Sequence, residues 1–204
     1  GQDKAALAYE GRQQLDRAFD LLAPRVSRCF VSLREDQKTD SVRGAYPGIT
    51  DRAQEIGPAA GLLAAHGEYP DVAWLVLACD LPFLDAATLD TLIQARGEDG
   101  AAVAFRSEHD GSPEPFCTIW ETEALEILSL QVAAGRVGPR QALINSVTSL
   151  LPACTPGALD NINTPQERQQ AQTRLARCRK QTATDGQVEW AGAIMSVDMA
   201  GLSN

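Results

Sequence analysis

The sequence lacks the patterns that mark nucleic-acid-binding, membrane-spanning and secreted proteins. It has no dense basic stripe, and its net charge is −9, which argues against a groove for nucleic acid. No apolar run approaches the roughly 18 residues of a membrane span, and we expect no signal peptide. The sequence therefore predicts a cytoplasmic protein that binds neither nucleic acid nor a membrane.

Neither the cysteines nor the histidines show a pattern that is typical of catalytic residues. The cysteines stand at positions 29, 79, 117, 154 and 178, an odd count whose spacing is typical of neither a disulfide framework nor a zinc site. Cys29, Cys79 and Cys117 lie in apolar runs and are predicted to be small core residues. His66 and His109 have no serine or cysteine partner in a recognisable setting, so we interpret both as structural or solvated.

What the sequence does contain is an alternation of apolar runs and helical periods. Trp74–Cys79 is apolar at every position, as in a parallel strand that is covered on both faces. Further strands are predicted at Cys29–Leu33, Ala101–Phe105, Phe116–Trp120 and Val147–Leu151. Helices are predicted at Ala5–Ala23, Ile56–His66, from the cap Asp85 onward, Glu121–Ala134, Pro139–Ile144 and Thr164–Lys180, and a loop at Arg34–Thr50. The pattern predicts an α/β protein with three layers, in which a mostly parallel sheet has helices on both faces.

The chain has the length of a single domain. Residues 1–180 are expected to form it, and residues 181–204 have no clear period and are interpreted as a tail or linker of unknown role. The sequence begins with Gly1-Gln-Asp-Lys4, directly before the first predicted helix. We therefore expect the first strand of the domain to lie upstream of Gly1.

Asp80 is the strongest single candidate for a functional residue. It follows the apolar run Trp74–Cys79, so the strand delivers its carboxylate to the carboxyl edge of the sheet, where such folds bind ligands. Magnesium favours one or two carboxylates together with phosphate oxygens. The alternative is that Asp80 only opens the turn before Pro82.

Two further candidates combine a polar residue with glycine. Lys4, beside a glycine turn, could pair with phosphates as a point charge, or the segment could be a solvated turn. Asp51 precedes Gly57-Pro-Ala-Ala-Gly61, and glycine near a helix start lets a ligand approach the backbone. Glycines that only mark the start of an ordinary helix would explain this segment equally well.

The last candidates lie in the second half of the chain. Asn161 and Asn163, spaced by two in an extended stretch, would point the same way and could bind a polar ligand, or they could simply lead into the Thr164 cap. Arg136 and Arg140 flank a glycine-rich turn and could bind an anionic substrate, or could be solvated.

Taken together and in order, these segments resemble one family. The chain resembles the molybdenum cofactor guanylyltransferases, within the larger fold group of nucleotide-sugar pyrophosphorylases. The matching segments are Gly1-Gln-Asp-Lys4, Asp51, Gly57-Pro-Ala-Ala-Gly61, Leu77-Ala-Cys-Asp-Leu-Pro-Phe83, Pro113-Glu-Pro-Phe-Cys117 and Asn161-Ile-Asn-Thr-Pro165. The family signature is a glycine-rich loop ending in Gly-x-Asp-Lys, of which only that ending stands at the start of this chain.

The resemblance implies a role for each segment. It implies that Lys4 contacts the nucleotide phosphates, that Asp51 and the turn from Gly57 to Gly61 contact the nucleotide, and that Asp80 holds Mg²⁺. Asn163 stands where some relatives carry a second acidic metal ligand; alternatively, Asn161 and Asn163 would both face the pterin substrate. The implied reaction moves GMP from GTP onto the phosphate of molybdopterin and releases pyrophosphate. Transient contact with cofactor-synthesis proteins or apo-molybdoenzymes is implied as well.

Two other functions remain open at this point. The same fold could transfer a cytidylyl group to the cofactor or a nucleotide to a sugar phosphate, although Asn161-Ile-Asn163 favours the guanylyl type. A protein of this fold that lacks the glycine-rich loop could also be a non-catalytic nucleotide- or pterin-binding partner.

Overall fold

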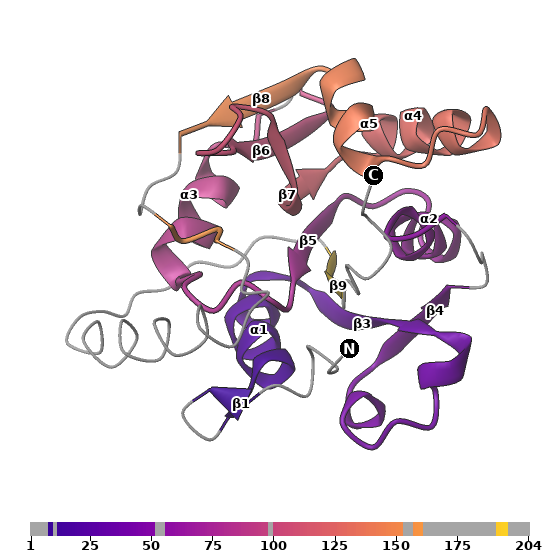
Figure 1. Cartoon of the computed structure of the whole chain (residues 1–204), viewed down its shortest axis with the longest axis vertical. Helices are drawn as coiled ribbons and strands as arrows, with labels where there is room; N and C mark the ends of the chain where they lie inside the picture. The colour runs from indigo at the N-terminus through magenta and orange to yellow at the C-terminus, as the bar shows by residue number, and fades with distance from the viewer. Residues whose placement is uncertain are drawn as a thin grey trace.

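The computed structural model describes residues 8–9, 12–51, 56–97, 100–152, 157–160 and 191–195 (Figure 1). The strands are β1 (Ala8–Tyr9), β2 (Arg12–Gln13), β3 (Arg28–Arg34), β4 (Gly48–Asp51), β5 (Trp74–Ala78), β6 (Ala102–Arg106), β7 (Pro113–Trp120), β8 (Thr148–Leu151) and β9 (Ala191–Met195). The helices are α1 (Gln14–Leu22), α2 (Ala59–Glu68), α3 (Ala86–Gln94), α4 (Thr122–Ala133) and α5 (Pro139–Asn145), with 3₁₀ turns η1 (Ala23–Arg25), η2 (Glu35–Gln37) and η3 (Arg43–Ala45). None of the helices so described is long and apolar enough to cross a membrane.

Seven strands form one mixed sheet in the order β4-β3-β9-β5-β7-β6-β8. Neighbouring strands are parallel except at β7, which runs antiparallel to both β5 and β6. The carboxyl ends of β3, β4, β5, β6, β8 and β9 therefore meet at one edge, which we call the strand-end edge. The reversed strand β7 begins at that edge.

Two separate apolar cores lie on the two faces of the sheet. Along β5, Leu75 and Leu77 pack with α1 and α3, whereas Trp74 and Val76 pack with α2, α4 and α5. This alternation follows from the period of two of a strand. Figure 1 shows α1 and α3 on one side of the sheet and α2, α4 and α5 on the other. The predicted α/β class, with helices on both faces of a sheet, is confirmed.

Several predicted elements are confirmed close to their predicted bounds, and their ends have local causes. Asp85 caps α3, because its carboxylate accepts a hydrogen bond from the Thr88 backbone amide at 2.8 Å. Pro24 lies in η1, directly after α1 ends, as expected for a residue that cannot donate a backbone hydrogen bond. Gly135 follows α4 with φ of 77°, a conformation that favours glycine as a helix terminator.

Three sequence predictions were wrong in extent or kind. The helix predicted from Ala5 begins only at Gln14, because β1 and β2 form a short antiparallel ribbon before it. The predicted loop from Arg34 to Thr50 contains two 3₁₀ turns and ends in β4. The predicted strand from Phe116 to Trp120 is longer than expected and begins at Pro113. The helix predicted at Thr164–Lys180 lies outside the described residues.

An interior position of the sheet is occupied by a strand that sequence analysis did not predict. β9 comes from residues 181–204, which we interpreted as a tail or linker, and lies between β3 and β5, parallel to both. Gly192 is in register with Cys29 on one side and with Leu75 on the other. Met195 is in register with Ser32 and Ala78.

Candidate functional site

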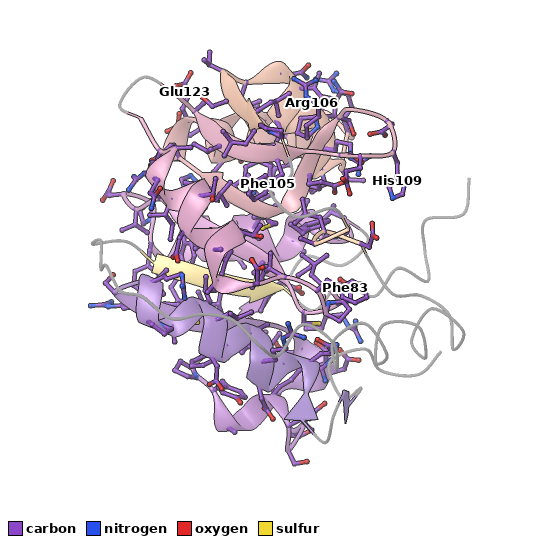
Figure 2. All side chains as sticks on the ribbon, turned by 90° about the vertical axis from the view of Figure 1, so that its left-hand side faces the viewer. Phe83, Phe105, Arg106, His109 and Glu123 are labelled. Atoms are coloured by element: carbon purple, nitrogen blue, oxygen red, sulfur yellow. The ribbon has the colours of Figure 1, made fainter. Side chains whose placement is uncertain are left out.

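The candidate residues that the structure describes gather at the strand-end edge. β4 ends at Asp51 and β5 leads into Asp80. Helix α2 begins at this edge because it follows β4, which ends there. Helix α5 begins there because it runs back to the opposite edge, where the next strand, β8, begins. Figure 2 shows Phe83 and His109 on one side of the molecule and Glu123, in the first turn of α4, on the other. Glu123 follows the reversed strand β7, which explains why it lies at the opposite edge.

Asp80 lies two residues beyond β5 and is 6% exposed. The turn that follows is closed by a hydrogen bond from the Leu84 amide to the Leu81 carbonyl at 3.2 Å. Arg17 of α1 donates to the Leu84 carbonyl at 3.1 Å and fastens the turn to the helix beside it. Asp80 itself takes part in an interaction within the protein. A buried carboxylate is costly unless it is satisfied, so this acid is held in a fixed place rather than solvated.

Asp51 ends β4 directly opposite Arg34 at the end of β3. Burial raises the pKa of the Asp51 carboxyl, Arg34 opposes that rise, and Asp36 adds to it. The guanidinium of Arg34 itself pairs with Asp36 at 3.2 Å. Sequence analysis placed Arg34 in a loop and missed it; the register of β3 with β4 is what brings this cation to the strand-end edge.

The glycine turn lies between β4 and α2. Gly57 has φ of 56°, in the left-handed region that side chains rarely adopt. Its carbonyl accepts a hydrogen bond from the Ala60 amide at 3.0 Å, and the turn leads into α2, where Gly61 is buried. The amino end of α2 therefore faces the strand-end edge with its first backbone amides, where a helix favours an anion.

Arg140, in the first turn of α5, lies beside β7, in the half of the sheet beyond β5 from Asp51. Its guanidinium is 3.2 Å from the Asp110 carboxylate and 3.6 Å from that of Glu114. Hydrogen bonds from Ser112, with a smaller contribution from Arg140, hold the pKa of Asp110 below its usual value. These contacts connect α5 to the loop before β7 and to the start of β7 itself. Arg140 thus lies at the strand-end edge with its charge shared between two acids.

The structure brings some predicted residues together and leaves others apart. Asp51 and Gly57 belong to one strand-to-helix connection, and β4 and β5 are three strand spacings apart, or about 14 Å. Arg140 lies beyond β5, among β7 and its neighbours. Lys4, Asn161 and Asn163 are outside the described residues. The predicted site thus extends across most of the strand-end edge.

The cysteines and histidines interpreted as non-catalytic lie in surroundings that do not activate a nucleophile. Burial raises the pKa of the Cys29 thiol to about 12, and burial raises that of Cys117 as well, so both are poor nucleophiles. The side chain of His109 is 84% exposed and 3.8 Å from Asp160. His66 is half-buried on α2. None of these groups forms a nucleophile with an adjacent base.

The donor set at the strand-end edge can be tested against a magnesium ion. The described part of the chain contains no cluster of three or more His, Cys, Asp or Glu residues that could hold a metal alone. Magnesium is instead commonly held by one or two carboxylates, with substrate phosphates and water completing its shell. A single fixed carboxylate such as Asp80 fits that mode of binding.

Comparison with known proteins agrees with this geometry. The family model described as the MobA-like NTP transferase domain matches residues 1–150. A molybdenum cofactor guanylyltransferase of Rhizobium meliloti is 31% identical over 198 residues, covering 86% of this chain and 85% of that protein. A molybdenum cofactor biosynthesis bifunctional protein of Synechocystis is 29% identical over 82% of this chain, which spans about half (48%) of that relative's length.

Solved structures share the fold. A molybdopterin-guanine dinucleotide biosynthesis protein A from Archaeoglobus fulgidus has a TM-score of 0.70 at 20% identity, covering 87% of this chain and 92% of that one. A 2-C-methyl-D-erythritol 4-phosphate cytidylyltransferase from Thermus thermophilus has a TM-score of 0.59 at 15% identity, covering 85% of this chain and 94% of that one. Fold and family model together define a nucleotidyltransferase. The chain belongs to the MobA-like NTP transferase domain family, and the resemblance noted in the sequence is confirmed.

Proposed function

We propose that this protein transfers GMP from GTP to the terminal phosphate of molybdopterin, with Mg²⁺ as cofactor and pyrophosphate as the second product. The observation that carries the proposal is Asp80, a fixed carboxylate at the carboxyl end of the central strand β5. Ligands of open α/β sheets bind at this edge. Two relatives named molybdenum cofactor guanylyltransferase, 25% and 31% identical to this chain, support the choice of both substrates.

The residues divide into a nucleotide side and an acceptor side. On the nucleotide side, Asp51 and the Gly57 turn lie beside the amino end of α2, and Lys4 would pair with the phosphates. On the acceptor side, Arg140 supplies a cation near the start of β7. Asn161 and Asn163 are proposed to contact the pterin. Asp80 lies between the two sides, where it would hold the metal.

The reaction requires positioning more than it requires a protein nucleophile. An oxygen of the molybdopterin phosphate attacks the α-phosphorus of GTP, a new phosphorus–oxygen bond forms, and the bond to the β-phosphate oxygen breaks in line. Both reactants are anions, so cations and helix amides lower the barrier by offsetting charge. A bound Mg²⁺ supplies Lewis-acid stabilisation of the phosphate oxygens. Asp80 and Lys4 orient the phosphates for the attack.

A nucleotide panel tests the proposal directly. Purified protein, Mg²⁺ and molybdopterin are incubated separately with GTP, CTP, ATP and UTP, and pyrophosphate release and the dinucleotide product are measured. Turnover with GTP well above the other nucleotides is expected. Turnover with CTP alone would overturn the guanylyl assignment in favour of cytidylyl transfer. Release of pyrophosphate only with a sugar phosphate would replace the acceptor, and nucleotide binding without any turnover would indicate a non-catalytic binding protein.

A further inference from the structure

The first half of β7 is irregular where the second half is regular. The register of β7 with β6 is continuous from Trp120 to Thr118 and resumes only at Pro113. Four residues of β7, Glu114–Cys117, therefore lie opposite Phe105 alone (Figure 2 labels Phe105). Extra residues of this kind form a β-bulge, which bends a strand and changes the direction of its side chains. We call Glu114–Cys117 the β7 bulge.

Two fully buried side chains from the second half of β7 hold the β7 bulge. The hydroxyl of Thr118 donates a hydrogen bond to the Glu114 carbonyl, and the indole Nε1 of Trp120 donates one to the Pro115 carbonyl at 3.2 Å. An interrupted ladder leaves backbone carbonyls that must find other donors, and these two side chains supply them. The two consecutive peptide groups that begin with these carbonyls are therefore fixed in place.

The β7 bulge determines where the Glu114 carboxylate lies. This carboxylate is 3.6 Å from the guanidinium of Arg140, and the Asp110 carboxylate is 3.2 Å from the same group. A separation of 3.6 Å is longer than a hydrogen bond, so Glu114 is the weaker of the two partners and the one that an incoming phosphate can replace. The Arg140 side chain is 43% exposed, which leaves its guanidinium open to an acceptor.

Trp120 is also connected to the helix that carries Arg140. Strand β7 and helix α5 are in contact, and Trp120 belongs to the same apolar core as Ala142 and Leu143 of α5. One buried side chain therefore supports the strand segment that bears Glu114 and the helix that bears Arg140. Displacing this side chain would change the position of both partners of the ion pair.

We propose that Thr118 and Trp120 are positioning residues for the acceptor side of the proposed reaction. They hold the β7 bulge, the bulge places Glu114 beside Arg140, and this pair keeps the guanidinium turned toward an incoming phosphate monoester. The inference rests on the proposed function, because it concerns the binding of the acceptor in that reaction. If the two side chains only stabilised the sheet, their loss would not affect one substrate more than the other.

Substitution of Thr118 tests the hydroxyl with little change of shape. Thr118→Val removes the donor to the Glu114 carbonyl and keeps a branched side chain, whereas Thr118→Ser keeps the hydroxyl. Thr118→Val should raise the KM for molybdopterin about three- to tenfold, as expected for the loss of one hydrogen bond, with kcat and the KM for GTP unchanged. Thr118→Ser should restore the wild-type KM.

The two tryptophans at the centre of the sheet form a matched pair. Trp74 of β5 is in register with Trp120, and both are fully buried. The Nε1 atom of Trp74 has no hydrogen-bond partner among the described residues, so Trp74→Phe removes an indole from the same core without removing a bond to the β7 bulge. Trp120→Phe should raise the KM for molybdopterin about as much as Thr118→Val, and Trp74→Phe should leave it unchanged.

A double-mutant cycle separates positioning from a general loosening of the sheet. If Thr118 acts through Arg140, Thr118→Val should cause no further increase in the KM for molybdopterin once Arg140→Ala is present. Independent effects that multiply in the double variant would show that Thr118 does not act through Arg140.

Steady-state kinetics with each substrate varied in turn, together with unfolding curves, distinguish the outcomes. An unchanged KM for molybdopterin in folded Thr118→Val would overturn the positioning role, as would equal increases in both KM values or an equal effect of Trp74→Phe and Trp120→Phe. If Trp120→Phe does not fold, the Thr118 variants and the cycle decide the question. Wild-type protein that transfers no nucleotide to molybdopterin would overturn the proposed function and the inference together, whereas wild-type turnover with unaffected variants would overturn the inference alone.

Discussion

The two halves of the sheet are built differently. The parallel half, β4-β3-β9-β5, has all its strands ending at the strand-end edge, whereas the mixed half, β7-β6-β8, contains the reversed strand β7. In the parallel half each strand end opens a connection that can present backbone amides and acids such as Asp51 and Asp80. In the mixed half the reversal brings the start of β7 to the same edge, with Glu114 beside Arg140.

This difference suggests that the two halves of the sheet bind different substrates. The parallel half offers a helix amino end, a glycine turn and two acids, which suit a nucleotide and its metal. The mixed half offers an arginine shared by two carboxylates on a loop and a helix, which suits an acceptor that must displace those carboxylates. The reaction would then take place where the halves meet, at β5 and Asp80.

The largest expected effect is on the free energy of unfolding, and it should be greater for a substitution at the centre of the sheet than for one at its edge. Leu75 of β5 is fully buried, whereas Leu150 of the edge strand β8 is only partly buried. Leu75→Ala should lower the free energy of unfolding by about 3–5 kcal/mol, and Leu150→Ala by about 1–2 kcal/mol, because the cost follows the cavity left behind. Urea denaturation measures both. Equal losses would show that the mixed half is as tightly packed as the parallel half.

A smaller effect is expected in the connection between β3 and β4. Backbone amides of Val42 and Arg43 and the guanidinium of Arg43 hold the pKa of Asp40 below its usual value, and Arg43 is buried. Asp40→Asn should therefore cost about 1–3 kcal/mol near neutral pH. The stabilisation by the carboxylate is complete above the unfolded pKa of about 4 and is lost as pH falls through the lower folded pKa.

Unfolding of the wild type and the Asp40→Asn variant across pH 2–7 checks this expectation. The difference in unfolding free energy should be constant from pH 7 to about pH 5 and should shrink below pH 4. A difference that persists unchanged at pH 2 would show that the Asp40 carboxylate is not its source.

The smallest expected effect separates the two substrates. Asp51→Asn, in the parallel half, should raise the KM for GTP about tenfold and leave the KM for molybdopterin unchanged. Arg140→Ala, in the mixed half, should do the reverse by a similar factor. Steady-state kinetics with each substrate varied in turn gives both values. If either variant changed both KM values equally, the assignment of one substrate to each half would be wrong.

The elements that could be predicted from the sequence have strong local signals. β5 is apolar at every position, and α3 begins with a capping aspartate, so neither needs tertiary context. β4 has a single buried residue, Ile49, in its four, too few for a period. The periodicity of β7 does not indicate that the strand is antiparallel, since a buried strand has the same apolar pattern whether it is parallel or antiparallel to its neighbours.

β9 was missed because its stability is not local. Ala191-Gly-Ala-Ile-Met195 contains two alanines and a glycine, which have low strand propensity, and it is held by neighbours on both sides. The site followed the same pattern: Asp80 was predictable from the strand before it, whereas the position of Arg34 opposite Asp51 depends on a register between strands. The sequence spacing of these two residues carries no signal for that pairing.

The most direct measurement of the central claim compares two aspartates on one turn. Asp80→Asn keeps the size of the side chain and removes its charge, whereas Asp85→Asn retains a residue able to cap α3. Magnesium-dependent pyrophosphate release from GTP and molybdopterin is measured for both, with unfolding curves to confirm the fold. The expected result is a loss of about 100-fold or more for Asp80→Asn and nearly unchanged turnover for Asp85→Asn. Wild-type turnover in the Asp80→Asn variant would contradict the assignment of Asp80 as the metal-binding carboxylate.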